Sequence, residues 1–311
     1  MSVKNKGLVS VIIPLFGDFD SKRIEICVDS IKNQREINCE IIVVEQTEIP
    51  KLGGLQDIVY KHIPPSFSED GFFIPSKVRN YAAKIAKGEF IYNNDGDILF
   101  FNNRYLEKLI GLLKEEPNSC FKHPPMRRLP IENFENLKKR YEAKGIDFAL
   151  SSLDCSQPYG ATYPENPIKI RHFIKEINGA KEVLVATQTD HEKYLGGKNK
   201  GKEPFFYTLE VHAGGTLMRK EQFEHIGGYC EKYSGWGCHD VDLQWRLKHF
   251  FDLKKIPQIS SFEVLHLDHQ RNYFSNERWK KNEMILSERQ SLGVLNIIKE
   301  DRYQYCNNDN G

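Results

Sequence analysis

Short apolar runs alternate with amphipathic segments along the first part of the chain. Residues 8–14 (LVSVIIP) and 40–46 (EIIVVEQ) are apolar runs of strand length, as expected for strands buried on both faces. Between them, Ile24, Val28 and Ile31 recur at helical spacing. Because strands that alternate with helices form right-handed βαβ units, this pattern predicts a parallel sheet.

The same alternation continues through residue 97. A helix is predicted over residues 77–88 (KVRNYAAKIAKG), with Gly88 as its stop. The inward face of this helix comprises Val78, Ala82 and Ile85. Residues 89–97 (EFIYNNDGD) follow as another strand with an acidic end. Ligands of parallel sheets bind beyond the carboxyl ends of the strands, so this end and that of the strand at 40–46 are expected near a ligand.

The pattern weakens from residue 120 to 205, where prolines cluster and the alternation assigns no strand. We interpret this region as an insertion with loops near the site. Order returns at residues 214–229, which predict a strand and a short helix. A helix beginning at His239, a late strand within 255–269, a closing helix at 276–290 and a frayed tail at 305–311 complete the prediction.

Composition and charge argue against several classes of protein. Among 311 residues, 44 Lys and Arg balance 43 Asp and Glu, so bulk charge does not indicate nucleic-acid binding. No apolar run approaches the roughly 18–20 residues that span a bilayer, and no signal peptide is recognised. The 7 cysteines form no C-x-x-C pair, which favours free thiols in a reducing cytoplasm over disulfides or structural zinc.

Two groups of polar residues have metal-ligand chemistry. Asp95 and Asp97 flank Gly96 in a predicted tight turn, where two carboxylates can hold a hard divalent cation and, through it, a diphosphate. His266 and His269 end the late strand and offer nitrogen ligands. Mixed Asp/His coordination favours Mn²⁺, with Mg²⁺ as the alternative. A polar turn and two surface histidines are the simpler reading of each group taken alone.

Residues 235–242 (GWGCHDVD) set Trp236 between two glycines, directly before the acidic start of a helix. The glycines allow the backbone and the indole to approach a flat apolar face, such as that of a sugar ring. Asp240 or Asp242 could serve only to complement the helix N-terminus. That reading leaves the Gly-Trp-Gly segment unexplained.

Residues 196–202 (GGKNKGK) match the phosphate-binding pattern G-x-x-x-x-G-K by letter. Glu203 replaces the Ser or Thr of that pattern, and Pro204 opposes the helix that should follow. A mobile basic loop is therefore the better interpretation. No G-x-G-x-x-G follows the first strand, so a dinucleotide-binding fold is also poorly supported.

Taken in order, these segments resemble nucleotide-sugar glycosyltransferases of the GT-A fold. Residues 8–110 resemble the N-terminal half of glycosyltransferase family 2, through the strand ending in Pro, the second strand with an acidic end, the Arg-Asn helix and the D-x-D triplet. Residues 208–272 resemble the C-terminal segment of β-1,4-galactosyltransferases and polypeptide N-acetylgalactosaminyltransferases. Its Gly-Trp-Gly-Glu-Asp-type motif also occurs in bacterial chondroitin and hyaluronan polymerases.

The resemblance implies an α/β GT-A (Rossmann-like) fold, in which helices flank a mostly parallel central sheet. It implies a single domain with an elaborated insertion. Residues 1–119 would form the nucleotide-binding half and 120–205 the insertion, while 206–311 would form the acceptor-binding and catalytic half with the C-terminal helix.

Site residues also follow from the resemblance. The implied general base is Asp240, and His239 departs from the family, which usually has Glu there. The implied metal ligands are Asp97, Asp95, His269 and His266. The residues implied to border the nucleotide or the sugar are Pro14, Phe16, Glu45, Arg79, Asn80, Asp95 and Trp236.

The implied activity is inverting transfer of a hexose or N-acetylhexosamine from a UDP-sugar to a hydroxyl of a glycan or lipid-linked glycan. The expected setting is capsule or O-antigen synthesis in the cytoplasm or at the inner face of the membrane, with at most peripheral membrane association. The loop at 195–202 is predicted to order over the donor. Two alternatives stay open: a metal-dependent nucleotidyltransferase or hydrolase with the same Asp/His site, and a non-catalytic glycan-binding module.

Overall fold

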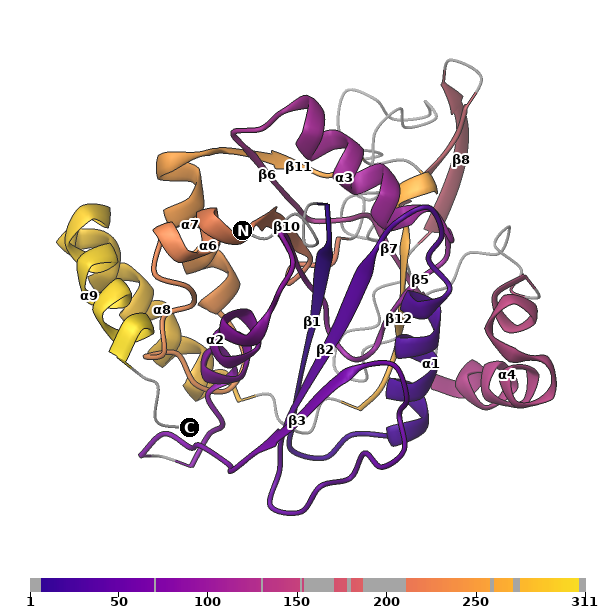
Figure 1. Ribbon diagram of the computed structural model, residues 1–311, viewed down its shortest axis with the longest axis horizontal. Coiled ribbons are helices and arrows are strands. Elements are labelled where there is room, and N and C mark those ends of the chain that lie inside the picture. Colours follow the sequence, from indigo (N-terminus) through magenta and orange to yellow (C-terminus); the bar gives the residue numbers. More distant parts are fainter. Residues whose placement is uncertain are drawn as a thin grey trace, which may run out of the picture.

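A seven-stranded sheet forms the centre of the computed structural model (Figure 1). The model describes residues 7–69, 71–129, 131–151, 153, 171–177, 180–186, 211–257, 260–270 and 275–307. The sheet contains β1 (Val9–Phe16), β2 (Cys39–Gln46), β3 (Val59–Ile63), β4 (Phe90–Asn93), β6 (Ser119–Lys122), β10 (Thr216–Arg219) and β11 (Asp252–Lys255). In space their order is β11-β6-β10-β4-β1-β2-β3, and only β10 pairs antiparallel with its neighbours. The predicted mostly parallel sheet is confirmed.

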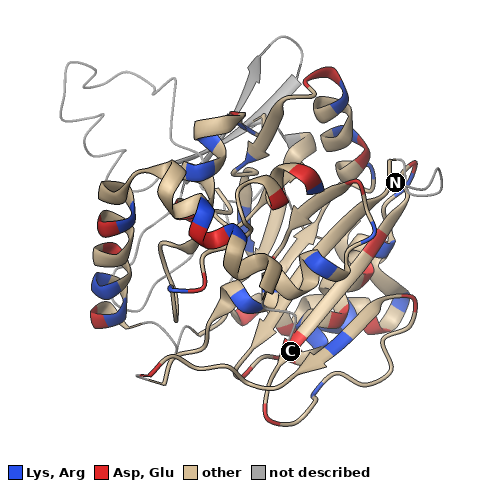
Figure 2. Cartoon of the chain, turned by 60° about the vertical axis from the view of Figure 1, so that its left-hand side comes forward, with Lys and Arg blue, Asp and Glu red and all other residues tan. Residues whose placement is uncertain are grey.

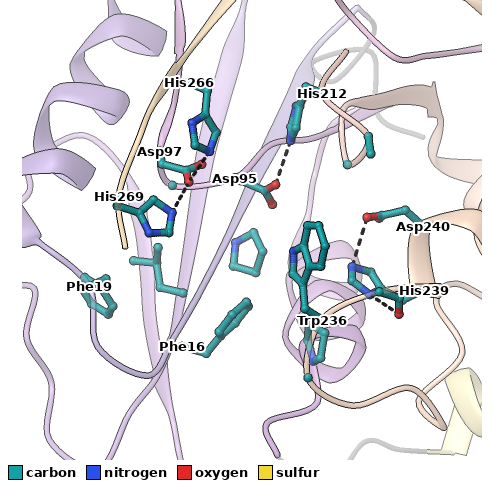
Figure 3. A pocket seen from close by; sticks show the side chains of 18 of the residues that line it. Phe16, Phe19, Asp95, Asp97, His212, Trp236, His239, Asp240, His266 and His269 are labelled. Atoms are coloured by element: carbon teal, nitrogen blue, oxygen red, sulfur yellow. Dashed lines mark hydrogen bonds and ion pairs between the residues drawn. The ribbon is translucent and has the colours of Figure 1, made fainter. Parts of the chain in front are cut away.

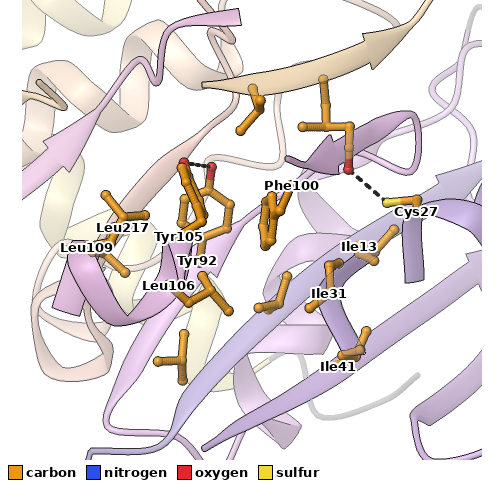
Figure 4. Close-up of a cluster of buried hydrophobic side chains, with 14 of the residues drawn as sticks. Ile13, Cys27, Ile31, Ile41, Tyr92, Phe100, Tyr105, Leu106, Leu109 and Leu217 are labelled. Carbon is orange, nitrogen blue, oxygen red and sulfur yellow. Dashed lines mark hydrogen bonds between the residues drawn. The ribbon is translucent and has the colours of Figure 1, made fainter. Parts of the chain in front are cut away.

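Helices cover both faces of the sheet because β1 is apolar on both sides. Successive side chains of a strand point to opposite faces. Val11 and Ile13 accordingly cluster with α1 (Ser21–Lys32), whereas Ile12 clusters with α2 (Pro75–Ile85). On the α1 side, α3 (Tyr105–Glu115) adds to the core, where the hydroxyls of Tyr92 and Tyr105 lie 2.8 Å apart (Figure 4).

The sequence contains residues that favour the start of α1 and of α2, but the predicted end of α2 needs correction. The side chain of Asp20 accepts hydrogen bonds from the first turn of α1, and Pro75 occupies the start of α2, where its missing N–H costs nothing. The predicted stop at Gly88 is wrong, since α2 ends at Ile85. A Cβ at Gly88 would lie 2.8 Å from the backbone oxygen of Leu8, so this glycine permits close approach to β1.

A second, three-stranded sheet brings distant segments together beside the first. It has the order β5-β12-β7 and comprises β5 (Ile98–Phe100), β7 (Met126–Leu129) and β12 (Val264–Leu267). His266 pairs with Ile98 in the antiparallel register of β12 and β5, and the amide of Leu267 donates to the carbonyl of Asp97 at 2.8 Å. This register places the His-Leu-Asp-His segment against the D-x-D turn.

The region between residues 120 and 205 contains more of the core than its pattern indicates. Its first part contributes β6 and β7 to the two sheets, followed by α4 (Ile131–Ser151), which is broken at Gly145, and the hairpin of β8 (Arg171–Ile177) and β9 (Ala180–Ala186). β6 and β7 have 4 residues each, too few for a periodic signal. The predicted loop at 195–202 lies outside the described residues.

The C-terminal third packs helices against the central sheet. It contains α6 (Lys220–His225), α7 (His239–Phe250), the 3₁₀ turn η2 (Ser260–Phe262), α8 (Asn276–Leu292) and α9 (Val294–Asn307). The frayed tail predicted from residue 305 is wrong at its start, because Tyr305 lies in α9 with its ring centroid 5.9 Å from that of Phe223. None of the helices that the model describes is long and apolar enough to cross a bilayer. Basic and acidic residues are interspersed along the helices (Figure 2).

Candidate active site

A cavity of about 850 Å³ opens at the carboxyl ends of β1 and β4. The end of β4 is one of the two strand ends expected near a ligand, whereas no residue of β2 lines the cavity. Side chains from both halves of the chain line it (Figure 3). The residues singled out from the sequence that line the cavity are Pro14, Phe16, Arg79, Asp95, Asp97, Trp236, Asp240, His266 and His269. Glu45 and Asn80 do not line it.

At one end of the cavity, Asp97 meets both histidines of the late strand. Its Oδ2 lies 3.1 Å from Nε2 of His266 and 2.9 Å from Nε2 of His269. Ligand atoms of these three residues all lie within 4.8 Å of one another. The other oxygen, Oδ1 of Asp97, is buried and has no hydrogen-bond partner among the described residues. One carboxylate and two imidazole nitrogens form a donor set suited to a transition-metal ion.

A second layer of contacts fixes His266. Its Nδ1 lies 2.8 Å from Oδ1 of Asp268, which also accepts a hydrogen bond from Arg128 at 2.8 Å. Burial alone would lower the pKa of His266, but the charges of Asp97 and the contact with Asp268 raise it. Conversely, burial would raise the pKa of Asp97, and the two histidines hold it well below the ordinary value. A carboxylate behind a histidine sets the tautomer and ring orientation of that ligand.

The two acids of the D-x-D turn separate in space. Asp95 is absent from the three-residue cluster: its Oδ1 accepts from Arg79 at 2.9 Å and its Oδ2 lies 2.8 Å from Nε2 of His212. Sequence reasoning missed His212, a buried cavity residue whose Nδ1 has no hydrogen-bond partner in the described part of the chain. No local motif marks it, because its partner lies 117 positions away.

Asp240 lies at the other end of the cavity, in the first turn of α7. The helix begins after Cys238, with no side-chain cap. The Asp240 carboxylate instead accepts from the hydroxyl of Tyr229 at 3.1 Å, and its other oxygen lies 3.1 Å from Nε2 of His239. Burial would raise the pKa of Asp240, but His239, followed by Arg79 and His212, lowers it well below the ordinary value. The side chain is ionised and 18% exposed toward the cavity.

The first turn of α7 also contains a second acid, which does not face the cavity. Asp242 is fully buried and accepts hydrogen bonds from Arg246 and Arg289, each at 2.8 Å. Asp301 of α9 accepts from the same Arg289 at 2.6 Å. This network joins α7, α8 and α9, so Asp242 has a structural role and leaves Asp240 as the acid available to a ligand.

Replacing Asp242 by alanine is expected to destabilise the protein by about 3–5 kcal/mol, because two buried guanidinium groups would share the single acid Asp301. Denaturant unfolding monitored by circular dichroism measures the change. A loss below about 1 kcal/mol would contradict the network assignment.

Both glycines of the Gly-Trp-Gly segment adopt backbone conformations that favour glycine. Gly235 and Gly237 have φ of 63° and 107°, a region that side chains disfavour. A Cβ on Gly237 would lie 2.6 Å from Cζ3 of Trp279. Trp236 is 38% exposed, with its ring centroid 5.5 Å from that of Trp279. The glycines thus let the loop fold over Trp279 and leave the indole of Trp236 at the cavity.

Gly237→Ala is expected to cost about 1–3 kcal/mol of stability, because it adds strain at a positive φ and a clash with Trp279. Gly111→Ala in α3 is the matched control: no atom lies within 4 Å of its added Cβ, and alanine is the better helix former. That variant is expected to gain about 0.5–1 kcal/mol. Equal unfolding free energies for the two variants would refute the explanation.

Glu45 and Asn80 hold loops in place. Glu45 accepts from the hydroxyl of Tyr60 at 2.7 Å and from the amide of Lys51 at 2.7 Å, which anchors the loop after β2. Asn80 donates to the carbonyl of Tyr229 at 2.9 Å and accepts from its amide at 2.8 Å. Their predicted positions at the nucleotide stay predictions, and their visible contacts position neighbouring segments.

The chain belongs to glycosyl transferase family 2. The protein-family model described as "Glycosyl transferase family 2" matches residues 10–226. A second model, described as "N-terminal domain of galactosyltransferase", matches residues 202–269. The two matches confirm the resemblance drawn from the sequence, including its division between two glycosyltransferase types. With the mostly parallel sheet, they identify the chain as a glycosyltransferase of the GT-A fold.

The solved structures that match the chain share little sequence with it. TarS 1–349 from S. aureus is 12% identical, with a TM-score of 0.47 and coverage of 89% of this chain and 64% of that one. The mannosyltransferase PcManGT from Pyrobaculum calidifontis, in complex with GDP-Man and Mn²⁺, is 16% identical, with a TM-score of 0.45 and coverage of 85% and 58%.

A mutant of the Drosophila beta-1,4-galactosyltransferase 7, in complex with manganese, UDP-Gal and xylobiose, is 13% identical, with a TM-score of 0.43 and coverage of 89% and 78%. The chain spans less than two thirds of the TarS and PcManGT chains. No curated protein matches the chain significantly.

Proposed function

We propose that the protein is an inverting, metal-dependent glycosyltransferase that uses a UDP-sugar donor. The observation that carries the proposal is the arrangement of one cavity: Asp97, His266 and His269 lie together at one end, and the ionised Asp240 lies at the other (Figure 3). Trp236 projects between the two ends. A cation site and a base on opposite sides of a sugar-sized space are what a single displacement at an anomeric carbon requires.

The donor end fits a divalent metal ion. Asp97, His266 and His269 would hold it. Oδ1 of Asp97, which has no hydrogen-bond partner within the described ranges, and two ring nitrogens offer ligands for Mn²⁺, with Mg²⁺ as the less suited alternative. Such an ion supplies charge neutralisation for the departing diphosphate. Phe16, stacked on Phe73 with ring centroids 3.9 Å apart, and the adjoining Pro14 offer an apolar surface for the uracil.

The acceptor end supplies the base. The acceptor hydroxyl gives its proton to Asp240 while its oxygen bonds to the anomeric carbon, and the bond from that carbon to the UDP oxygen breaks with its electron pair. Attack opposite the leaving group inverts the configuration. Trp236 presents its indole to a sugar ring, and the guanidinium of Arg79, bonded to Asp95, borders the same space.

The donor sugar is proposed to be a hexose or N-acetylhexosamine, and the acceptor a glycan or lipid-linked glycan. The likeness of the Gly-Trp-Gly segment to that of bacterial polymerases favours a surface polysaccharide, such as capsule or O-antigen, as the product. Synthesis from UDP-sugars would then take place in the cytoplasm.

Release of UDP from a panel of UDP-hexoses and UDP-N-acetylhexosamines tests the proposal, with Mn²⁺ or a chelator and with or without glycan acceptors. We expect release that requires the metal and rises strongly with one acceptor class. Release that is indifferent to every acceptor would indicate a hydrolase, and release of a sugar 1-phosphate in place of UDP would indicate a nucleotidyltransferase. Acceptor binding with no release from any donor would indicate a glycan-binding module.

A further inference from the structure

His239 contacts Asp240 through an arrangement in which both ring nitrogens face hydrogen-bond acceptors. Its Nε2 lies 3.1 Å from Oδ2 of Asp240, and its Nδ1 lies 3.3 Å from the carbonyl oxygen of Gly237. A neutral imidazole carries one N–H, so it can donate to only one of these oxygens. An imidazolium donates to both. Because an ionised carboxylate can only accept hydrogen bonds, the 3.1 Å contact with Asp240 requires the N–H to be on Nε2.

Tyr229 holds the other oxygen of the same carboxylate. Its buried hydroxyl donates to Oδ1 of Asp240 at 3.1 Å. The backbone of Tyr229 is fixed in turn by both polar atoms of the Asn80 side chain, and the guanidinium of Arg79 lies 5.3 Å from the centre of its ring. Tyr229 therefore has little freedom to move away from Asp240.

The consequence is a carboxylate with one fixed donor on each oxygen. A carboxylate has about four lone-pair sites, so each oxygen of Asp240 keeps one for a ligand hydroxyl. We propose that His239 is a positioning residue, which with Tyr229 fixes the plane of the Asp240 carboxylate so that a free lone pair faces the acceptor hydroxyl. This inference rests on the proposed role of Asp240 as the base. It gives a function to the residue at which the sequence departs from the family.

The groups around Asp240 predict how its ionisation responds to the loss of His239. Burial raises the pKa of Asp240 and His239 is the first influence that lowers it, so removal of the imidazole charge should raise that pKa. The base form would then be lost at a higher pH as the solution is acidified. The other ionisable groups that face or influence Asp240 are Tyr229, Arg79, His212, His123 and Asp95.

Two amide substitutions separate the contacts of His239. The amide nitrogen of glutamine reaches about as far as Nε2 and keeps the donor to Asp240, whereas that of asparagine reaches only as far as Nδ1. We expect His239→Gln to retain most of kcat, with the acid limb of its pH–kcat profile shifted to higher pH. His239→Asn and His239→Ala should lose about 10–100-fold in kcat, the range seen when a supporting partner of a site residue is removed. KM for the donor should stay unchanged.

If His239 has only a structural role, a different result is expected. All three variants would then lose thermal stability, and the glutamine and asparagine variants would have similar kcat. An asparagine variant within twofold of the wild-type kcat, or a glutamine variant as impaired as alanine, would overturn the inference. Tyr229→Phe, which removes one hydroxyl and keeps the ring, should lower kcat with the donor KM intact; an unchanged kcat would remove Tyr229 from the arrangement.

A measurement without turnover separates this inference from the proposed function. The ¹⁵N spectrum of histidine-labelled protein, assigned by loss of one signal in His239→Gln, should show a proton on Nε2 of His239, as the contact with Asp240 requires. An unprotonated Nε2 in the wild-type protein would overturn the inference whatever the enzyme does. Absence of sugar transfer with the expected spectrum would instead overturn the proposed function.

Discussion

Asp240→Asn is expected to lower the rate of sugar transfer by about 10²–10⁴-fold, the usual cost of removing a positioned base. Asparagine keeps the size of the side chain and can still accept from His239, but it cannot take up a proton. The metal cluster at the other end of the cavity contains no atom of residue 240. Folding and metal-dependent UDP binding should therefore be normal.

Thermal stability, UDP affinity and transfer rate of this one variant decide the role of Asp240. A residue that only complements the helix N-terminus would change stability by under about 1 kcal/mol and leave turnover near normal. Since the Asp240 side chain makes no cap contact in α7, we expect the loss to fall on kcat. If turnover stays within a few-fold of wild type, His239 is the next residue to test as the base. Asp242 is not a candidate, because it is fully buried and ion-paired.

Asp97→Ala is expected to abolish Mn²⁺-dependent UDP binding. Asp97 is the only carboxylate of the three-residue cluster, and its loss leaves two neutral imidazoles, with one ligand fewer and no charge to attract the cation. Because the histidines keep the pKa of Asp97 well below its ordinary value, the carboxylate stays charged across the neutral range. Calorimetric titration of UDP with and without Mn²⁺ measures the loss.

Asp268→Asn is a second variant of the metal site, for which we expect a partial loss of metal affinity. Asp268 contacts His266 from behind and is not a member of the cluster, so its loss should weaken metal affinity by about 10–100-fold without abolishing it. If Asp97→Ala binds UDP in Mn²⁺ as tightly as the wild type, the cluster is not the metal site. If the two variants are equally impaired, Asp268 has a larger role than orientation.

The central sheet was predictable from the sequence because its main strands are buried on both faces. Val9–Phe16 and Cys39–Gln46 have 8 residues each, long enough for an unbroken apolar run to be recognised. β6 and β7 have 4 residues each and owe their conformation to their neighbours in the sheets, whereas the equally short β12 lies within the predicted late strand. The contribution of β6 and β7 to the region after residue 120 was therefore not visible in the pattern.

The members of the site were predictable only where chemistry and local spacing coincide. Asp97, His266 and His269 stood out as acid and histidine motifs at strand ends. The structure brings Asp97 and His269 into contact although 172 positions separate them in the sequence. His212 and Tyr229 carry no motif, and their parts depend on single contacts with Asp95 and Asp240 across the fold. Two acids with similar sequence context, Asp240 and Asp242, differ in the structure because one helix turn directs them to different surroundings.

The sequence by itself determined the α/β class, the order of its main strands and helices and the resemblance to two glycosyltransferase types, because all of these are written in local periodicity and short motifs. Only the tertiary structure decided which of these residues meet. The register of β12 against β5 joins His266 to Asp97, and the fold directs Asp95 to Arg79 and His212. Such pairings depend on distances between chain segments that packing sets, and no local pattern encodes them.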